Sequence, residues 1–263
     1  MTTFRTLASG SGGNAALLSR ENVHVLIDMG ISCRRICTAL KSLGLTPEDL
    51  DAILVTHEHS DHIKGLETYV KKYRTPVFCT PAVSRQLDYR IAGIGPLLRA
   101  MAYGERVRFG EVEAEILPTS HDCQESAAWH FTVPEGRVGY LTDTGYIVEE
   151  TGKRLLGADI LVLESNHDVD MLRQGNYPFL LKRRILSDLG HLSNAAAAVY
   201  AAESVRAGTR IVLLAHLSRD NNTPEMALET VGAALAGLDV VLAAAPRDEL
   251  SEACQLEDVK CSV

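Results

Sequence analysis

The chain has 263 residues, of which 46% are hydrophobic and 23% charged, a composition typical of one large soluble α/β domain. No apolar run reaches the 18 residues of a transmembrane helix, and Met1–Arg5 do not begin a secretory signal, so we expect one domain, residues 1–263, in the cytoplasm. The net charge of −8 argues against broad, nonspecific attraction to nucleic acid, although divalent cations or a local basic strip can reverse the field in one cleft.

Short apolar runs alternate with amphipathic segments, and no linker or low-complexity tract divides the chain. The apolar runs end in polar or glycine-rich turns, which predicts strands. In chain order, the predicted strands are Phe4–Ala8, Ala15–Leu18, Val23–Asp28, Ala52–Thr56, Val77–Cys79, Val112–Leu117, Ala128–Val133, Arg137–Leu141, Ile160–Glu164, Arg210–Leu214 and Val240–Ala244.

Four helices are predicted between these strands. Apolar residues at helical spacing predict the first two, Ile31–Leu43 and Ile63–Tyr73. Ser193 is a candidate N-cap for a third helix over Asn194–Ala207, which is rich in alanine. The fourth helix covers Pro224–Ala236 and has its proline in the first turn, where proline is tolerated.

Two pairs of segments resemble each other within the chain. Leu26–Gly30 and Tyr140–Gly145 are both apolar strands that end in Asp-x-Gly, and Leu54–His57 has an apolar counterpart in Leu161–Glu164. Strand–Asp–Gly turns are common, so each match alone is weak. Together they hint at two similar halves packed face to face.

The segment His57–His62 places three histidines and one aspartate in a single turn after a predicted strand. His57 and His59 are two residues apart, so both imidazoles can lean to one side, while Asp61 and His62 can reach a second metal ion. Imidazole combined with carboxylate suits borderline divalent ions such as Zn²⁺ or Mn²⁺. Because this turn has no cysteine, an open catalytic site is favoured over a closed structural zinc site.

This His-x-His-x-Asp-His pattern resembles the signature of the metallo-β-lactamase superfamily. The resemblance implies an αββα fold, a four-layer sandwich in which two mixed β-sheets are flanked by helices. It also implies two divalent metal ions, one held by His57, His59 and His121, the other by Asp61, His62 and His216, with Asp143 bridging them. Asp28 would accept a hydrogen bond from a ligand histidine and so fix its tautomer.

Four further segments resemble the YycJ/WalJ branch, which is related to nucleases of the ribonuclease Z and ribonuclease J types. They are Ala8–Asn14, Glu164–Asp168, Gly190–Asn194 and His216–Asn222. The branch implies an exonuclease that acts 5′ to 3′ on DNA. Too few residues separate Asp143 from His216 for the inserted cap domain of the ribonuclease J type, so we expect loops of the core fold to capture the substrate.

Asp61, already a candidate ligand, and His191 are the predicted catalytic residues. His191 precedes a predicted helix N-terminus, where free N–H groups and the helix dipole favour an anion. It could hydrogen-bond the scissile phosphate or protonate the leaving oxygen. The alternative is that His191 caps or packs against the alanine-rich helix.

Six residues are candidate substrate contacts, each with a structural alternative. Ser11 and Asn14 belong to a glycine-rich loop that could hold a phosphate or simply form a tight hairpin. His167 could touch substrate or join a loop hydrogen-bond network. The basic run Lys182, Arg183 and Arg184 could contact the phosphate backbone or form a solvated helix face.

The sequence therefore predicts a phosphodiesterase with two divalent ions, Zn or Mn, in which a hydroxide bridging the metals attacks nucleic acid. DNA is the expected substrate, ahead of RNA, and we expect no membrane partner; the oligomeric state stays open. The alternative is a small-molecule hydrolase of the same fold, namely a lactonase, thioesterase, glyoxalase or cyclic-nucleotide phosphodiesterase.

Overall fold

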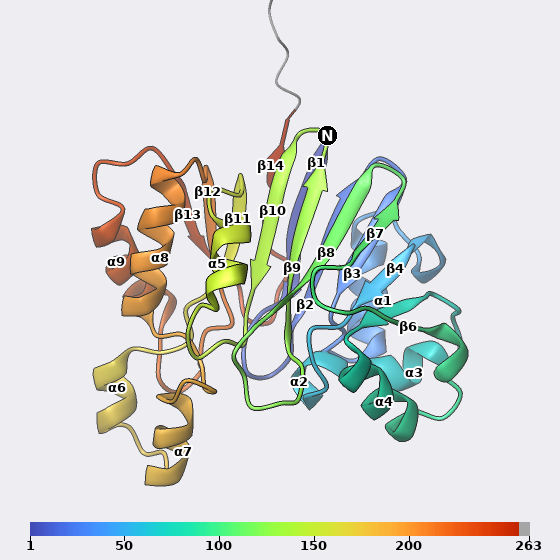
Figure 1. Cartoon of the computed structure of the whole chain (residues 1–263), viewed down its shortest axis with the longest axis horizontal. Coiled ribbons are helices and arrows are strands. Elements are labelled where there is room, and N and C mark those ends of the chain that lie inside the picture. Colours follow the sequence, from blue (N-terminus) through green and yellow to red (C-terminus); the bar gives the residue numbers. More distant parts are fainter. Residues whose placement is uncertain (258–263) are drawn as a thin grey trace, which may run out of the picture.

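The computed structural model describes residues 1–257 and contains two seven-stranded sheets packed face to face (Figure 1). In spatial order, the first sheet consists of β14 (Cys254–Leu256), β1 (Thr2–Ala8), β2 (Ala15–Arg20), β3 (Val23–Ile27), β4 (Ala52–Leu54), β5 (Val77–Cys79) and β6 (Leu98–Ala100). The second consists of β13 (Val241–Ala244), β12 (Ile211–Ala215), β11 (Ile160–Glu164), β10 (Gly136–Leu141), β9 (Ala127–Val133), β8 (Val112–Pro118) and β7 (Arg106–Phe109).

Helices cover the outer face of each sheet. The first sheet is covered by α1 (Cys33–Ser42), α3 (Leu66–Val70) and α4 (Pro81–Arg90), and the second by α5 (Glu149–Leu155), α8 (Asn194–Arg206) and α9 (Pro224–Ala234). The remaining short helices are α2 (Ser60–Ile63), α6 (Val169–Gln174), α7 (Phe179–Ile185) and the 3₁₀ turns η1 (Pro47–Asp49) and η2 (Gly95–Leu97). The order helix, sheet, sheet, helix is the predicted four-layer αββα sandwich.

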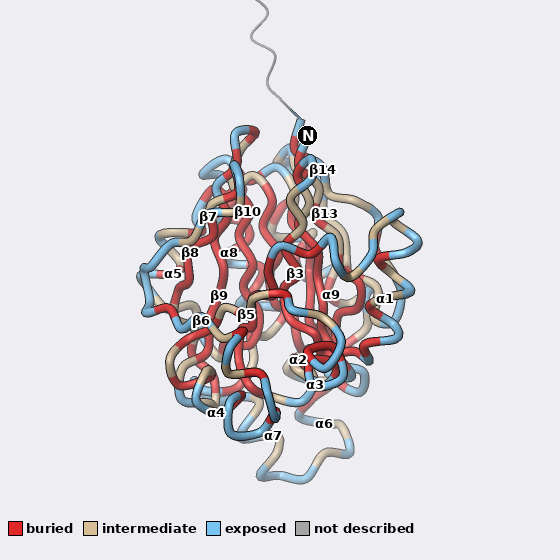
Figure 2. Tube along the Cα trace, turned by 90° about the vertical axis from the view of Figure 1, so that its right-hand side faces the viewer, coloured by how far each residue is buried: buried red, intermediate tan, exposed pale blue. Residues whose placement is uncertain are grey.

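Three apolar clusters hold these layers together. One fills the space between the two sheets and contains Phe4, Trp129 and Phe131, and the other two lie between each sheet and its helices. Figure 2 shows the buried strands inside a shell of exposed helices and loops. Burial of this apolar surface is the main driving force for the fold.

The two sheets repeat one topology. In each, three antiparallel pairs are followed by three parallel pairs, and β3 and β10 are the strands at which the pairing changes. Leu26–Gly30 and Tyr140–Gly145 therefore occupy equivalent places in the two sheets. The two similar halves predicted from these segments are confirmed.

The strands predicted from the sequence are all present, but one helix differs. The predicted helix Ile63–Tyr73 is shorter in the structure, where Ile63 ends α2, Lys64 and Gly65 form a turn, and α3 covers only Leu66–Val70. A Cβ atom at Gly65 would lie 2.3 Å from the carbonyl oxygen of Ile31, so only glycine fits where this turn meets the segment before α1. Within residues 1–257, no helix combines the length and apolar character needed to cross a membrane.

Candidate metal centre

The candidate residues lie in loops that follow the carboxyl ends of strands in both sheets. Asp28 follows β3, the His57–His62 turn follows β4, and His121, Asp143 and His216 follow β8, β10 and β12. Figure 1 shows α2, which contains part of this turn, at the lower edge of the sandwich between the two halves. The edge where the two sheets meet therefore gathers ligands from both.

Three of these strand ends have a strained backbone. Asp28, Asp143 and His216 have φ angles of 58°, 58° and 56°, in the left-handed region that residues other than glycine rarely adopt. Such strain persists only where the surrounding structure enforces it, and it is frequent at functional sites. Here it is concentrated at the edge that carries the candidate ligands.

The seven candidate ligands converge in space. Within each of two groups the ligand atoms lie within 4.8 Å of one another, and these groups are His57, His59 and His121, and Asp61, His62 and His216. Asp143 lies between them, with Oδ2 3.3 Å from His62 Nε2 and Oδ1 3.8 Å from His121 Nε2. We call these seven residues the cluster.

Asp28 fixes the orientation of one histidine of the cluster. Its buried carboxylate lies 2.7 Å from His62 Nδ1 and accepts hydrogen bonds from the backbone N–H and the hydroxyl of Thr56, at 2.8 and 2.9 Å. The contact expected between Asp28 and a candidate ligand is thus present. A carboxylate in this place selects the tautomer that leaves Nε2 free for a metal ion.

Glu164, to which the sequence analysis gave no role, makes the equivalent contact in the second sheet. Its Oε1 lies 2.7 Å from His216 Nδ1 and 2.8 Å from His191 Nδ1, while Oε2 accepts from the backbone N–H groups of Thr144 and Leu192. The side chain is fully buried. The signal that could have found it was an acidic residue ending an otherwise wholly apolar strand.

Several buried polar atoms of the cluster lack a hydrogen-bond partner among the described residues, namely His57 Nε2, His216 Nε2 and Asp143 Oδ2. Leaving such atoms unpaired is costly unless a ligand satisfies them. Burial and the surrounding histidines hold the pKa of His57 well below its usual range, so its ring is neutral and has a lone pair to donate. Although burial opposes it, Asp143 and other carboxylates raise the pKa of His216 to about 10, so this side of the cluster attracts positive charge. These features fit divalent cations.

His191 lies in the same cleft. Its Nδ1 is 3.7 Å from Asp143 Oδ1, and its ring centroid is 4.9 Å from that of His121. At the start of the following helix, the N–H of Asn194 donates to the His167 carbonyl and the N–H of Ala196 donates to the Ser193 hydroxyl, so these two groups are not open to an anion. The anion beside this segment is the protein's own Glu164 carboxylate.

The other candidate substrate contacts differ in their placement. Asn14 is buried, with Nδ2 3.2 Å from His62 Nε2, whereas Ser11 is exposed in the preceding turn. His167 is buried and forms an isolated β-bridge with Ser193, outside the cluster. Burial lowers the pKa of His167 to about 4, which keeps its ring neutral near pH 7.

The basic run lies on α7, and its three side chains have different partners. Lys182 Nζ donates to the carbonyls of Arg173 and Gly175, both at 2.7 Å. Arg184 forms an ion pair with Asp122, which directly follows His121 in the sequence. Arg183 remains exposed.

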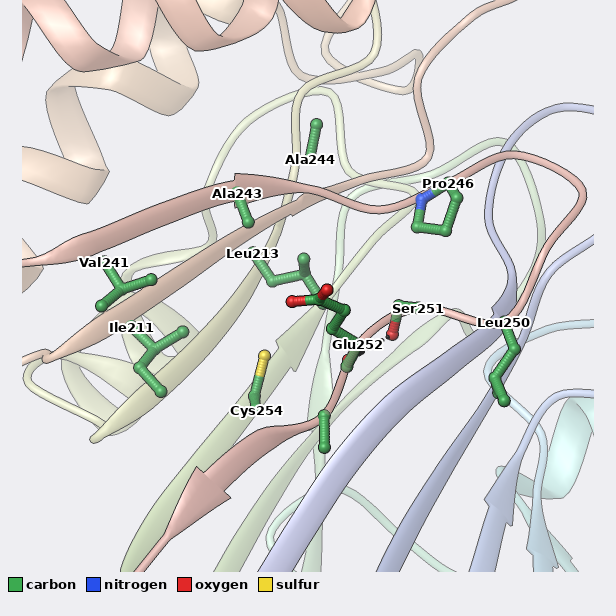
Figure 3. Close-up of a pocket in the computed structure, with 11 residues that line it drawn as sticks. Ile211, Leu213, Val241, Ala243, Ala244, Pro246, Leu250, Ser251, Glu252 and Cys254 are labelled. Carbon is green, nitrogen blue, oxygen red and sulfur yellow. Dashed lines mark hydrogen bonds between the residues drawn. The ribbon is translucent and has the colours of Figure 1, made fainter. Parts of the chain in front are cut away.

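A separate apolar hollow of about 380 Å³ lies between β12, β13 and the segment before β14 (Figure 3). Ile211, Leu213, Val241, Ala243 and Cys254 are among the residues that line it. Residues other than the cluster form its walls, so the hollow and the candidate metal centre are distinct features.

Comparison with known proteins agrees with this geometry. Residues 24–217 match the family described as the β-lactamase superfamily domain. The chain is 39% identical to exodeoxyribonuclease YycJ of Bacillus anthracis over 88% of both chains, and 36% identical to exodeoxyribonuclease WalJ of Streptococcus pneumoniae over 90% of this chain and 89% of that one. The metallo-β-lactamase fold protein YhfI from Bacillus subtilis shares the fold, with a TM-score of 0.72 and 19% identity over 96% of this chain and 100% of that chain. The chain therefore belongs to the metallo-β-lactamase superfamily and, within it, to the group that includes the YycJ and WalJ proteins.

Proposed function

We propose that this protein is a metal-dependent exonuclease that removes nucleotides from the 5′ ends of DNA. The observation that carries the proposal is the cluster, in which Asp143 lies between two groups of ligand atoms. The similarity to two exodeoxyribonucleases over most of the chain supports a nucleic-acid substrate. We also propose that the single domain works without an inserted cap.

The residues present fit two divalent ions, Zn or Mn, because imidazole nitrogens and carboxylate oxygens gather in two neighbouring groups. His57, His59 and His121 would hold one ion, Asp61, His62 and His216 the other, and Asp143 would contact both. When bound, such ions lower the pKa of water to about 7 and offset negative charge on phosphoryl oxygens.

The side chains around the cluster have separate tasks. Asp28 and Glu164 hold His62 and His216 by their Nδ1 atoms and so keep the two rings in one orientation. We propose that Asp61, which is partly exposed and has Oδ2 3.5 Å from His62 Nε2, also accepts a hydrogen bond from the attacking water at the open side of the site.

We propose that His191 acts as the general acid. Its Nδ1 faces Glu164, which leaves Nε2 to carry a proton toward the oxygen that leaves phosphorus. The side chain is 20% exposed, so the ring is reachable from the cleft while its orientation is fixed by a buried carboxylate.

A panel of substrates tests the proposal. Metal-loaded protein is incubated with 5′-labelled DNA, 3′-labelled DNA, RNA, bis-p-nitrophenyl phosphate and a lactone, and a variant with Asp143→Asn serves as the inactive control. We expect short products to appear first from the 5′ label, with DNA cleaved faster than RNA. Cleavage of the lactone alone would show a small-molecule hydrolase instead.

A further inference from the structure

Helices α6 and α7 form an arm, residues 169–185, that extends below the sandwich beside the candidate metal centre (Figure 1). None of the residues of α7, Phe179–Ile185, is buried. Phe179 and Leu180 are 71% and 75% exposed. Large apolar side chains gathered on a surface mark an interaction site.

The arm also differs in charge from the rest of the protein. Residues 169–185 contain four basic residues and one acidic residue, whereas the whole chain has a net charge of −8. A local positive surface on an acidic protein favours a negatively charged partner.

One face of α7 combines aromatic and basic side chains. Phe179 and Arg183 are four residues apart, and the guanidinium carbon of Arg183 lies 5.8 Å from the centroid of the Phe179 ring. Leu180 and Arg184 are also four residues apart, so they lie next to Phe179 and Arg183 on the same surface of the helix. Lys182 points the other way, toward α6, where its amine donates to backbone carbonyls.

This face leads directly to the cluster. Arg184 forms an ion pair with Asp122, whose Oδ1 lies 3.3 Å from His121 Nε2. The backbone N–H of His191 donates to the carbonyl of Ile185, the last residue of α7, at 3.1 Å. An extended ligand bound along α7 would therefore continue into the cleft that contains the cluster.

We propose that this face of α7 binds single-stranded DNA, with a base stacked on Phe179 and phosphates contacted by Arg183 and Arg184. Stacking on an aromatic side chain is worth about 1–3 kcal/mol per base and tolerates any sequence. A base inside a duplex already has both faces covered by its neighbours. The inference rests on the proposed function and adds that the bound DNA strand is unpaired where it crosses α7.

The test compares Phe179→Ala with Leu180→Ala, a matched loss of an exposed apolar side chain on the same helix. Binding of a short phosphorothioate oligothymidylate to metal-loaded protein is measured by fluorescence anisotropy. We expect Phe179→Ala to weaken binding about 5- to 150-fold, the equivalent of one lost stack. Leu180→Ala should remain within about twofold of the unchanged protein, because an aliphatic side chain offers no ring on which a base can stack. Phe179→Trp should bind as the unchanged protein does.

An abasic site placed at successive positions of the oligomer identifies the stacked base, because it should weaken binding to the unchanged protein but not to Phe179→Ala. Turnover of bis-p-nitrophenyl phosphate should be the same in all variants, since this small substrate does not reach α7. Equal binding by Phe179→Ala and the unchanged protein would overturn the inference, as would equal losses in both alanine variants.

Two further outcomes separate this inference from the proposed function. If sedimentation shows that Phe179→Ala abolishes self-association, this face of α7 is a contact between copies of the chain, and the proposal that it binds DNA is wrong. If the unchanged protein binds the oligomer through Phe179 but cleaves no DNA, α7 is a DNA-binding site and the proposed nuclease function is wrong.

Discussion

At the scale of single residues, two buried carboxylates have matching roles in the two halves. Asp28 contacts His62 Nδ1 and Glu164 contacts His216 Nδ1, each at 2.7 Å. Each carboxylate also accepts backbone hydrogen bonds, which fix it in place. Glu164 differs because it contacts His191 as well, so one side chain positions a candidate ligand and the candidate acid.

Replacing His191 by alanine should lower turnover by at least about tenfold, because general-acid help is typically worth about 10²–10⁴ in rate. Metal content and thermal stability should stay near those of the unchanged protein, because the ring is partly exposed and lies outside the seven candidate ligands. Loss of metal in this variant would make His191 a ligand. Loss of stability with normal turnover per folded molecule would make it structural.

Replacing Glu164 by glutamine should weaken metal affinity about 10- to 100-fold, the usual cost of removing a carboxylate that orients a ligand histidine. The affinity is measured by competition with a chromophoric chelator. Glu203→Gln, an exposed change on α8, is the matched control and should not alter it. Unchanged affinity in Glu164→Gln would show that His216 does not need this contact.

The sequence predicted much of this site because its residues lie in distinctive local patterns. The His57–His62 turn is one short segment, and Asp28 and Asp143 share an Asp-x-Gly ending. Glu164 has no such local mark, because its role depends on histidines 27 and 52 residues further along the chain. The ion pair of Asp122 was not predicted for a similar reason, since its partner Arg184 lies on a helix far along the chain.

At the scale of elements, close backbone packing holds the cluster loops in place. Gly30 N donates to Asn14 O, and Asn14 N donates to the Asp61 carbonyl, so three loops are joined around the His57–His62 turn. A Cβ atom on Gly30 would lie 1.6 Å from the Asp61 oxygen, and one on Gly145 would lie 2.3 Å from the carbonyl oxygen of Asp188. The glycine of each Asp-x-Gly segment therefore permits a close backbone contact.

Gly30→Ala should destabilise the protein by about 3 kcal/mol or more, because the new methyl group meets backbone atoms that cannot move aside without displacing the His57–His62 turn. Gly12→Ala is the control, since a Cβ there meets no atom within 4 Å, and it should change stability by no more than about 0.5 kcal/mol. Urea unfolding of both variants measures the difference. Similar stability in the two would contradict this packing.

Elements with weak periodicity were not foreseen from the sequence. β6 and β14 have only three residues each, too few to show alternation, and β7 is half exposed at the edge of its sheet. α4 does have a recognisable start, with Thr80 as N-cap and Pro81 in the first turn. The arm has no buried residue in α7 and so lacks the apolar stripe from which helices are predicted.

At the scale of the whole molecule, a buried histidine on the outer side of the second sheet, near Glu115 and Arg154 of α5, also determines how the protein responds to acid. His130 in β9 is buried, and neither ring nitrogen has a hydrogen-bond partner within residues 1–257. Burial and then Arg154 lower the pKa of His130 to about 4. The unfolded chain, with an ordinary histidine pKa of about 6.5, binds a proton that the folded protein does not.

Stability should therefore fall as the pH drops from about 6.5 to 4, by at most about 1.4 kcal/mol for each pH unit from this residue. His130→Leu removes the titrating ring, so its stability curve should be flatter than that of the unchanged protein across this window. Urea unfolding of both proteins at several pH values measures the difference between their free energies of unfolding. The contributions of all other titrating groups are common to both proteins and cancel in this difference. Parallel curves would show that His130 does not contribute.

The central claim is that the edge where the two halves meet holds two divalent ions between seven side chains. Elemental analysis of protein purified without chelator, or reconstituted with Zn²⁺ or Mn²⁺, tests it most directly. We predict two ions per chain, because two separate groups of ligand atoms, His57, His59 and His121 on one side and Asp61, His62 and His216 on the other, lie on either side of Asp143. At most one ion per chain after reconstitution would contradict the account.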